Sequence, residues 1–282
     1  MLSIIILSFK NPGLLRLCLN SLAKELPRNL DCEIIVVDNA STYKTRSVVK
    51  NEFNDKFRKI KLVPIKENAG YTRGVNEGIK KAEGEYIFYI NHDVVITQGS
   101  IEALLGYFKS RPDIGLIASE LLNFNGTHQN SCFRFYTPAT ILYRRAPYLP
   151  FASKKLDHFT MNDKNMKEPM EVDWISGAAF MSSRLAINKV GLLDENLFHY
   201  FSDVDWSRRF WENGYKVVYC PVSKIYHYHG QGSRGRFGIF DVFLNKETRW
   251  HITDAFKYFR KHGISARLAK ASGGARAKSL YS

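Results

Sequence analysis

Residues 86–93 read Tyr86-Ile87-Phe88-Tyr89-Ile90-Asn91-His92-Asp93, an apolar run that ends in polar residues. The apolar part predicts a buried β-strand, and Asn91 and Asp93, two positions apart, share one face of an extended chain. An open α/β sheet presents its ligand-binding groups at the carboxyl ends of its strands. A carboxylate is also the hard oxygen ligand that Mg²⁺ or Mn²⁺ prefers. With its flanking sequence, this stretch indicates a metal-dependent enzyme acting on a nucleotide-activated substrate.

Strand and helix signals alternate through the first 120 residues. Asn11-Pro12 is typical of a helix start, because an N-cap residue precedes a proline at the first helical position. Apolar runs predict further strands, with helical spacing between them, at 2–8, 33–37, 61–65 and 114–118. Successive βα units of this length predict an α/β fold with a mainly parallel sheet and right-handed crossovers.

The pattern changes after about residue 122. Residues 123–170 are rich in aromatic residues, Arg, Pro and Asn without clear periodicity, which predicts loops and an acceptor-facing surface. Regular signals then return, and they predict elements at 172–180, 184–190, 203–212, 216–220 and 240–261.

The composition limits the classes of protein to which this chain could belong. The 282 residues are 45% hydrophobic and 24% charged, which is ordinary for a globular protein, and no run of eighteen apolar residues predicts a transmembrane helix. The N-terminus resembles a first strand and not a signal peptide. The four cysteines lack metal-type spacing, which predicts reduced thiols in a cytosolic protein.

The charge is uneven along the chain. The net charge is +14, and seven Lys or Arg residues with no Asp or Glu lie between Lys257 and the C-terminus. Such a tail suits an anionic membrane, an anionic substrate or nucleic acid, although a solvated tail without a partner has the same composition. No nucleic-acid recognition motif is visible, so we expect no nucleic-acid partner.

Polar residues follow the predicted strands at Ser8, Asp38, Asn68, Asn91 and Asp93. The carboxyl ends of parallel strands lie on one edge of a sheet, so we expect these groups to converge. The segment 70–76 adds glycines and Arg73 beside that edge, without the spacing of a dinucleotide fingerprint or a P-loop. Arg73 suits a diphosphate through its bidentate fork, although a lone surface arginine would look the same.

In these segments the chain resembles family 2 glycosyltransferases of the GT-A fold, particularly the rhamnosyltransferase-like branch that builds bacterial surface polysaccharides. The resemblance covers about residues 2–235, and the ordered set of segments carries it. The matching segments are Ser3–Asn11, Ile34–Ser41, Glu67–Tyr71, Asn76–Ile79, Gly84–Asp93, Asp173–Ala178, Gly191–Asp205 and Ile225–His227. The resemblance implies a Rossmann-like, mainly parallel central sheet flanked by helices, with a C-terminal helical extension.

The resemblance implies roles on the donor side. Asp38 matches the aspartate that reads the nucleotide base, while Arg73 and Asn76 match positions near the donor. Asn91-His92-Asp93 occupies the family's D-x-D segment, with asparagine in place of the first aspartate. Asp93 would then bind Mg²⁺ or Mn²⁺ that contacts the donor diphosphate. A metal that arrives with the nucleotide sugar suits this single carboxylate. With Ser8 and Asn68, these residues form the expected donor site.

On the acceptor side, Ser202-Asp203-Val204-Asp205 opens a predicted helix. Asp203 matches the family's catalytic base, Ser202 departs from the usual glutamate, and Asp205 is the fallback base and an expected acceptor contact. Trp174, Ser176 and Gly177 match the acceptor-side segment, where the tryptophan would stack on a sugar or belong to the core. The resemblance also places a metal-binding histidine at His227 or His229; as a pair beside Tyr228 they would otherwise be structural.

The resulting hypothesis is an inverting glycosyltransferase (EC 2.4) that acts in cell-surface polysaccharide synthesis. It would move a sugar from dTDP-rhamnose or a UDP-sugar to a glycan, either free or linked to a polyprenyl diphosphate. We expect a nucleotide-sugar-binding half at 1–120, an acceptor-binding and catalytic half at 121–235, and a C-terminal helix with a basic tail at 236–282. The expected location is the cytoplasm, at the inner face of the plasma membrane, as a peripheral membrane protein. The alternatives are a non-catalytic nucleotide-sugar-binding protein on the same fold and a sugar-1-phosphate nucleotidyltransferase, whose Gly-rich loop after strand one is missing here.

Overall fold

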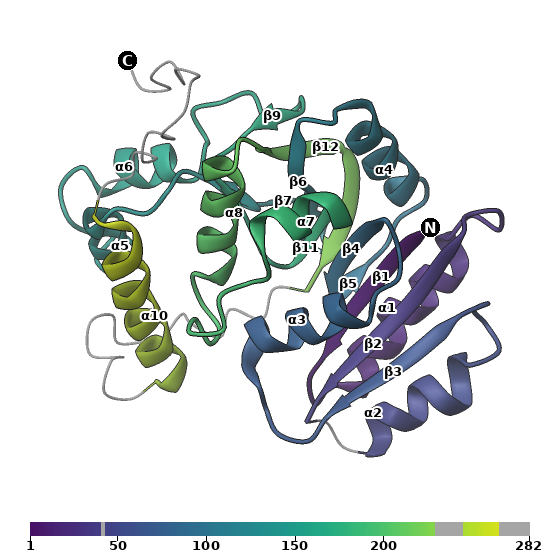
Figure 1. The fold of residues 1–282 in the computed structure, drawn as a ribbon. Helices are drawn as coiled ribbons and strands as arrows, with labels where there is room; N and C mark the ends of the chain where they lie inside the picture. Colours follow the sequence, from purple (N-terminus) through teal and green to yellow (C-terminus); the bar gives the residue numbers. More distant parts are fainter. Residues whose placement is uncertain (41–42, 229–244, 265–282) are drawn as a thin grey trace.

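The computed structural model describes residues 1–40, 43–228 and 245–264 as an α/β fold (Figure 1). Its strands are β1 (Leu2–Ser8), β2 (Cys32–Asn39), β3 (Ile60–Ile65), β4 (Tyr86–Asn91), β5 (Val94–Val95), β6 (Ile114–Leu122), β7 (His128–Gln129), β8 (Cys132–Phe133), β9 (Met170–Glu171), β10 (Trp174–Ile175), β11 (Ala179–Ser183) and β12 (Lys216–His227). Its helices are α1 (Pro12–Glu25), α2 (Tyr43–Ser47), the π-helix η1 (Val48–Phe53), α3 (Gly70–Lys81), α4 (Ser100–Ser110), α5 (Pro138–Arg145), α6 (Ala152–Phe159), α7 (Arg184–Val190), α8 (Ser202–Glu212) and α10 (Lys246–His262).

One large sheet runs through the molecule in the order β3-β2-β1-β4-β11-β6-β12-β5. The first four strands are mutually parallel, and β12 is parallel to β6. β11 lies antiparallel between β4 and β6. The predicted α/β class with a mainly parallel sheet is therefore confirmed, with β11 as an antiparallel insertion.

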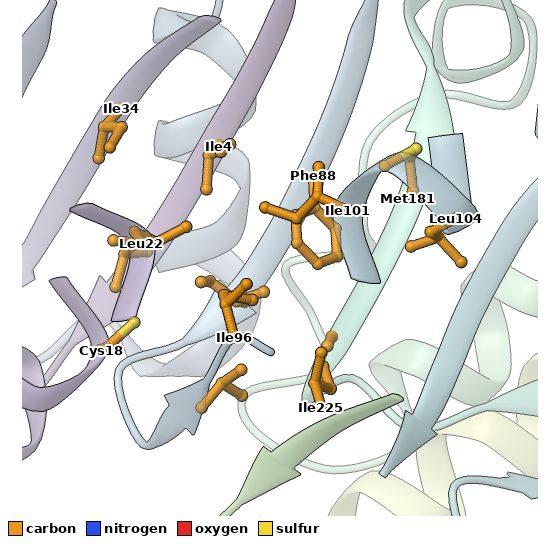
Figure 2. Close-up of a cluster of buried hydrophobic side chains, with 14 of the residues drawn as sticks. Ile4, Cys18, Leu22, Ile34, Phe88, Ile96, Ile101, Leu104, Met181 and Ile225 are labelled. Atoms are coloured by element: carbon orange, nitrogen blue, oxygen red, sulfur yellow. The ribbon is translucent and has the colours of Figure 1, made fainter. Parts of the chain in front are cut away.

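One face of the sheet packs against α1, η1 and α4. Side chains alternate along each strand, so Ile4 and Ile6 of β1 face this layer, and Cys18 and Leu22 of α1 pack against them. Figure 2 shows this cluster continuing from Ile34 through Phe88 to Leu104 of α4 and Ile225 of β12. The cluster fixes the strands whose carboxyl ends carry the polar residues.

The opposite face packs against α3, α7 and α8. Gly74 and Gly78 let α3 lie close to β1, because a Cβ at these positions would come within 2.5 Å of Leu7 Cδ1 and 2.3 Å of Ile5 Cγ2. These glycines therefore serve close packing, which lets the N-terminal end of α3 reach the sheet edge.

The C-terminal half contains more regular structure than its sequence indicates. The region predicted as loops, 123–170, holds α5, α6 and two short strand segments, and β12 runs seven residues beyond the predicted strand end. A separate aromatic core joins α5, α6, α8 and α10, which lie side by side in Figure 1. The loop prediction was wrong because these short helices bury few residues each and so show no clear 3.6-residue period.

All four cysteines are free thiols. Burial raises the pKa of the Cys132 thiol to about 12, which makes it unreactive. Within the described ranges, none of the helices combines the length and apolarity that crossing a bilayer requires.

Candidate active site

The carboxyl ends of β1, β2 and β4 meet at one edge of the sheet. Ser8 is in register with Asp38, and Leu7 is in register with Asn91. Ser8 is fully buried, and its hydroxyl has no hydrogen-bond partner among the described residues. The structure thus brings together the polar strand ends that the sequence predicts.

Asp38 is fully buried at this edge and is paired with Arg46 of α2. Arg46 Nε donates to Asp38 Oδ2 over 2.7 Å. Arg73 projects from α3 as an exposed side chain. Ser41, the last residue of the motif around Asp38, lies outside the described residues.

Asn68 organises the loop between β3 and α3. Its Oδ1 accepts from Asn39 Nδ2 at 3.1 Å and from the Gly70 N–H at 3.0 Å. Gly70 adopts φ +79°, and a Cβ there would lie 2.5 Å from the carbonyl oxygen of Phe198. Asn68 therefore shapes the donor-side loop, and its expected donor contact stays a prediction.

The hydrogen bonds of Asn76 are all made with the loop before α8. This buried side chain donates to the Leu193 carbonyl oxygen and to Glu195, and it accepts from the Leu193 N–H. Its polar atoms are occupied by the loop before α8. The expected donor contact is therefore corrected to a structural role that holds this loop on α3.

Asp93, in the turn between β4 and β5, lies beside His227 at the end of β12. His227 Nε2 lies 3.5 Å from Asp93 Oδ1. That oxygen is buried and accepts no hydrogen bond from any described residue. An orphaned buried carboxylate oxygen beside an imidazole nitrogen is a donor set suited to a divalent cation.

The two side chains form only part of a cation shell. Among the residues that the structure describes, no three His, Cys, Asp or Glu side chains come together as a complete metal site. Mg²⁺ characteristically keeps waters and takes substrate phosphate oxygens in addition to one or two carboxylates. The residues present therefore fit a metal that shares its ligands with a diphosphate. His229, the other candidate ligand, lies outside the described residues.

Asp203 stands in the first turn of α8, following Phe201 in a left-handed conformation. Its Oδ2 accepts from the Gly177 N–H at 3.0 Å, and its Oδ1 accepts from the Val204 N–H at 3.0 Å. Burial raises the pKa of Asp203 to about 6, against the opposing effects of these backbone hydrogen bonds and of Arg144. A carboxylate with this pKa is suited to general-base chemistry near neutral pH.

Two tyrosines, Tyr71 and Tyr89, lie between Asp203 and the Asp93–His227 pair. The Tyr71 hydroxyl donates to the Gly177 carbonyl oxygen at 2.8 Å, beside the N–H that binds Asp203. Tyr71 contacts Tyr89 edge to face, with ring centroids 5.7 Å apart, and the Tyr89 hydroxyl donates to Asn91 Oδ1. Asp203 and the Asp93–His227 pair therefore border one continuous surface, which is formed by β4, α3 and the loop at 176–178.

Gly177 has no space for a side chain. A Cβ there would lie 2.3 Å from the Tyr71 hydroxyl oxygen and 3.5 Å from Asp203 Oδ2. The neighbouring Ser176 N–H donates to the Ser131 carbonyl oxygen at 2.8 Å. The 176–177 segment therefore lies beside Asp203, and its expected contact with an acceptor stays a prediction.

Two expected acceptor contacts are corrected. Trp174 is buried, stacks on Phe133 at 4.3 Å between centroids, and donates its indole N–H to the Arg134 carbonyl oxygen, so it belongs to the core. Asp205 is fully buried and binds Arg209 and His262 at 2.9 and 2.7 Å. Neither side chain is available to an acceptor, and Asp205 is not placed to serve as the fallback base.

The loop before α8 is held by the C-terminal helix. Asp254 of α10 is 1% exposed, and its carboxylate accepts from the N–H groups of Phe198, His199 and Tyr200 at 3.4, 3.1 and 3.0 Å. On the other side, the Phe198 carbonyl oxygen accepts from the Tyr71 N–H at 3.1 Å. The loop that leads to Asp203 is thus fixed from both directions.

Sequence reasoning missed several residues that shape the site. Arg46, Tyr71 and Asp254 had no assigned role, and neither did Gln129, whose Oε1 lies 2.7 Å from His227 Nδ1. The aromatic Tyr71 beside Gly70 and the Asn125-Gly126 turn signal before Gln129 were visible but did not specify a partner. Nothing in the sequence around Asp254 indicates that it binds a loop more than fifty residues away.

Known proteins share both sequence and fold with this chain. Residues 3–167 match the family model "Glycosyl transferase family 2". The chain is 25% identical over 202 residues to the poly(ribitol-phosphate) beta-N-acetylglucosaminyltransferase TarS of Staphylococcus aureus, covering 70% of this chain and 35% of TarS. It is 25% identical over 262 residues to the dTDP-rhamnosyl transferase RfbF of Shigella flexneri, covering 89% of this chain and 78% of RfbF.

The match to TarS thus spans about a third of that protein's length. Among solved structures, GalNAc-T7 with UDP, GalNAc and Mn²⁺ superposes with a TM-score of 0.61 at 19% identity, covering 85% of this chain and 46% of that one. At this identity the likeness shows the fold, which is GT-A. Because the family model covers more than half of the sequence, the chain belongs to glycosyl transferase family 2.

Proposed function

We propose that this protein is a metal-dependent, inverting glycosyltransferase that moves a sugar from a nucleoside-diphosphate donor to a glycan acceptor. One observation carries the proposal: a continuous surface of contacting residues, through Tyr89 and Tyr71, joins the Asp93–His227 pair to Asp203. It supplies a site for a diphosphate-bound cation and a base of raised pKa on one sheet edge. Family membership favours glycosyl transfer over nucleotidyl transfer.

In the proposed reaction, the ionised Asp203 carboxylate takes the proton of the acceptor hydroxyl. That oxygen forms a bond to the anomeric carbon as the bond from this carbon to the diphosphate oxygen breaks, and the nucleoside diphosphate leaves with the electron pair. Attack from the opposite side inverts the anomeric centre. The Gly177 and Val204 N–H groups keep the carboxylate oriented throughout.

We assign Asp93 and His227 to hold Mg²⁺ or Mn²⁺. Bound there, the cation would neutralise charge on the departing diphosphate. Asp38, on the other side of the same edge, is assigned to bind the nucleotide base. Arg73 and Ser8 are assigned to bind the part of the donor that lies between Asp38 and the cation. Asn91 is also assigned to bind the donor, and the hydrogen bond from the Tyr89 hydroxyl orients its side chain.

The named relatives support the general class of reaction but leave the donor open. RfbF is named for dTDP-rhamnose chemistry and TarS for N-acetylglucosamine transfer. We therefore propose a dTDP-rhamnose or UDP-sugar donor and a surface-polysaccharide acceptor, either free or lipid-linked. Residues 1–120 would form the donor half and 121–235 the acceptor half.

The melting temperature of the full chain should rise when one nucleoside diphosphate is added, and only when Mn²⁺ or Mg²⁺ is present. A ligand at a hundredfold its Kd adds about 2.7 kcal/mol to the free energy of unfolding, which is readily measured. The test uses UDP, dTDP, GDP, CMP and ADP with and without metal. A dTDP response indicates rhamnose, and a UDP response indicates a hexose or hexosamine. The absence of any shift would count against a nucleotide-sugar site, and therefore against the proposed enzyme.

We further propose that the outer face of α10 contacts an anionic membrane surface in the cytoplasm. Ile252 and Phe256 are 41% and 68% exposed, and the exposed Arg249 and Arg260 lie on the same helical face. An apolar strip between basic side chains suits an interface with anionic lipids. The basic tail that the sequence adds to this surface lies mostly outside the described residues.

Replacement of both Ile252 and Phe256 by serine should weaken binding to phosphatidylglycerol-containing vesicles at least about tenfold, since each such side chain contributes roughly 1.5–3 kcal/mol when buried. Co-sedimentation with vesicles measures the effect. Leu185→Ser is the matched control, because Leu185 is 75% exposed on α7. Equal binding by both variants contradicts the proposal. Deletion of residues 257–282 is a poorer test, because it removes the buried Tyr258.

A further inference from the structure

A tight hairpin between β6 and β7 carries Gln129 to His227. Leu121 pairs with Gln129 across the hairpin. The Asn123 N–H donates to the Thr127 carbonyl oxygen at 2.8 Å, and Gly126 occupies the turn at φ +81°. The backbone of this loop is therefore well defined up to Gln129.

The side chains of the hairpin form a directed chain of hydrogen bonds. The Thr127 N–H donates to Asn125 Oδ1 at 3.1 Å, which identifies that atom as the acceptor. The Thr127 hydroxyl donates to the same oxygen at 2.7 Å and therefore accepts from Asn123 Nδ2 at 2.9 Å. The remaining amide atom, Asn123 Oδ1, then accepts from Gln129 Nε2 at 2.8 Å. The backbone thus sets the orientation of each amide in turn.

A second contact fixes Gln129 in the same orientation. Its Nε2 also lies 3.4 Å from the backbone carbonyl oxygen of His227, which can only accept. Its Oε1 lies 2.7 Å from His227 Nδ1. An amide oxygen cannot donate, so Nδ1 must carry the ring proton.

The consequence appears at the other ring nitrogen. In a neutral imidazole with its proton on Nδ1, Nε2 offers a lone pair. This lone pair is 3.5 Å from Asp93 Oδ1, the buried oxygen without a described hydrogen-bond partner. His227 Nε2 and Asp93 Oδ1 are therefore both placed to be ligands of one cation.

We infer that Gln129 is a positioning residue that selects the His227 tautomer competent to bind a divalent cation. It acts through His227 and does not touch substrate. The inference deepens the proposed function and rests on it for the identity of the site as a metal site. Outer-shell partners of this kind orient metal-binding histidines and raise their basicity.

The first test is the tautomer of His227 in the metal-free, ¹⁵N-labelled full chain at a pH where the ring is neutral. Long-range ¹H–¹⁵N spectra should show the proton on Nδ1, with the signal assigned by its loss in His227→Gln. In Gln129→Leu the proton should redistribute to Nε2. A wild-type ring protonated on Nε2 overturns the inference.

The second test is the affinity for Mn²⁺ alone, measured by electron paramagnetic resonance of the free ion. Gln129→Leu should weaken binding about 10- to 100-fold, as for other outer-shell partners of metal ligands. Gln129→Glu keeps an acceptor toward Nδ1 and should retain most of the affinity. Gln98→Leu is the matched control, because Gln98 is exposed in the turn before α4.

Unchanged Mn²⁺ affinity in Gln129→Leu, or a wild-type protein that binds no Mn²⁺, overturns the role. A melting temperature for each variant shows that the fold is retained, and Gln129→Glu supplies the comparison where the leucine variant is unstable. These readouts do not use sugar transfer. If both tests succeed and no transfer is found with any donor, the proposed function fails and the metal-positioning role of Gln129 stands.

Discussion

Asp203→Asn should lower the rate of sugar transfer about 10²- to 10⁴-fold, the range that general-base catalysis contributes. Asparagine has nearly the same shape and keeps an oxygen for one of the two N–H groups, at Gly177 or Val204, that bind the carboxylate. It cannot take a proton from the acceptor hydroxyl. Donor affinity should stay nearly constant, because Asp38 and Asp93 lie on other elements. Single-turnover rates and nucleotide-induced thermal shifts separate the two effects.

The pH profile provides an independent check on the same residue. Because the pKa of Asp203 is raised to about 6, wild-type kcat/KM should fall about tenfold per pH unit below that value, as the base becomes protonated. The residual activity of Asp203→Asn should lack this dependence. Equal turnover in wild type and variant would remove Asp203 from the role of base.

The same pKa also has a stability consequence of defined sign. Asp203 has an ordinary pKa of 3.8 and about 6 in the folded protein, so between these values the folded state binds more protons than the unfolded state. The contribution of this group to folding therefore weakens as the pH rises through that window. The folded protein therefore holds the reactive, ionised form of Asp203 at some cost to its stability.

Asp254→Ala should reduce both stability and turnover. We expect a loss of about 2–4 kcal/mol in the free energy of unfolding, because hydrogen bonds to a charged group contribute roughly 1.5–3 kcal/mol and the donors are left unpaired. The carboxylate binds three consecutive N–H groups of the loop that precedes α8. A misplaced base should also lower kcat about 10- to 100-fold, since an error of about 1 Å in position is sufficient.

Denaturant unfolding and steady-state kinetics measure the two effects of Asp254→Ala. Asp254→Asn keeps one acceptor oxygen and should lie between the alanine variant and wild type. Thr253→Ala, one residue away on the exposed side of α10, is the matched control and should change stability by less than about 0.5 kcal/mol. A wild-type kcat in folded Asp254→Ala would show that the loop keeps its position without α10.

The sequence predicted well which polar residues gather at one edge of the sheet, because that edge follows from periodicity. Buried strands produce continuous apolar runs, and the first polar residue after each run must lie at the shared edge of a parallel sheet. Ser8, Asp38 and Asn91 were therefore found without any knowledge of tertiary contacts. The early strands and helices are joined by short connections, which the sequence also shows.

The errors arose where a side chain's partners are distant in sequence. Asn76 lies in a matching segment, yet its amide is fully used by residues 117 to 119 positions away. Asp205 looks like a second catalytic carboxylate beside Asp203 until α10 supplies His262, 57 positions later. A motif identifies which residue type is present, but only tertiary contacts show which polar atoms remain free for a ligand. Gln129, 98 positions from His227, was missed for the same reason.

The lone oxygens of Ser8 and Asp93 have a further consequence. They make this sheet edge a locally frustrated region, in which two buried oxygens have no hydrogen-bond partner among the described residues. Substitutions that relieve this frustration, such as Ser8→Ala, remove a cost that only a bound ligand otherwise offsets. Selection for a more stable protein and selection for a better catalyst therefore act in opposite directions at these positions. If this edge binds the donor, as we propose, it is where a stabilised laboratory variant of this protein would lose its activity first.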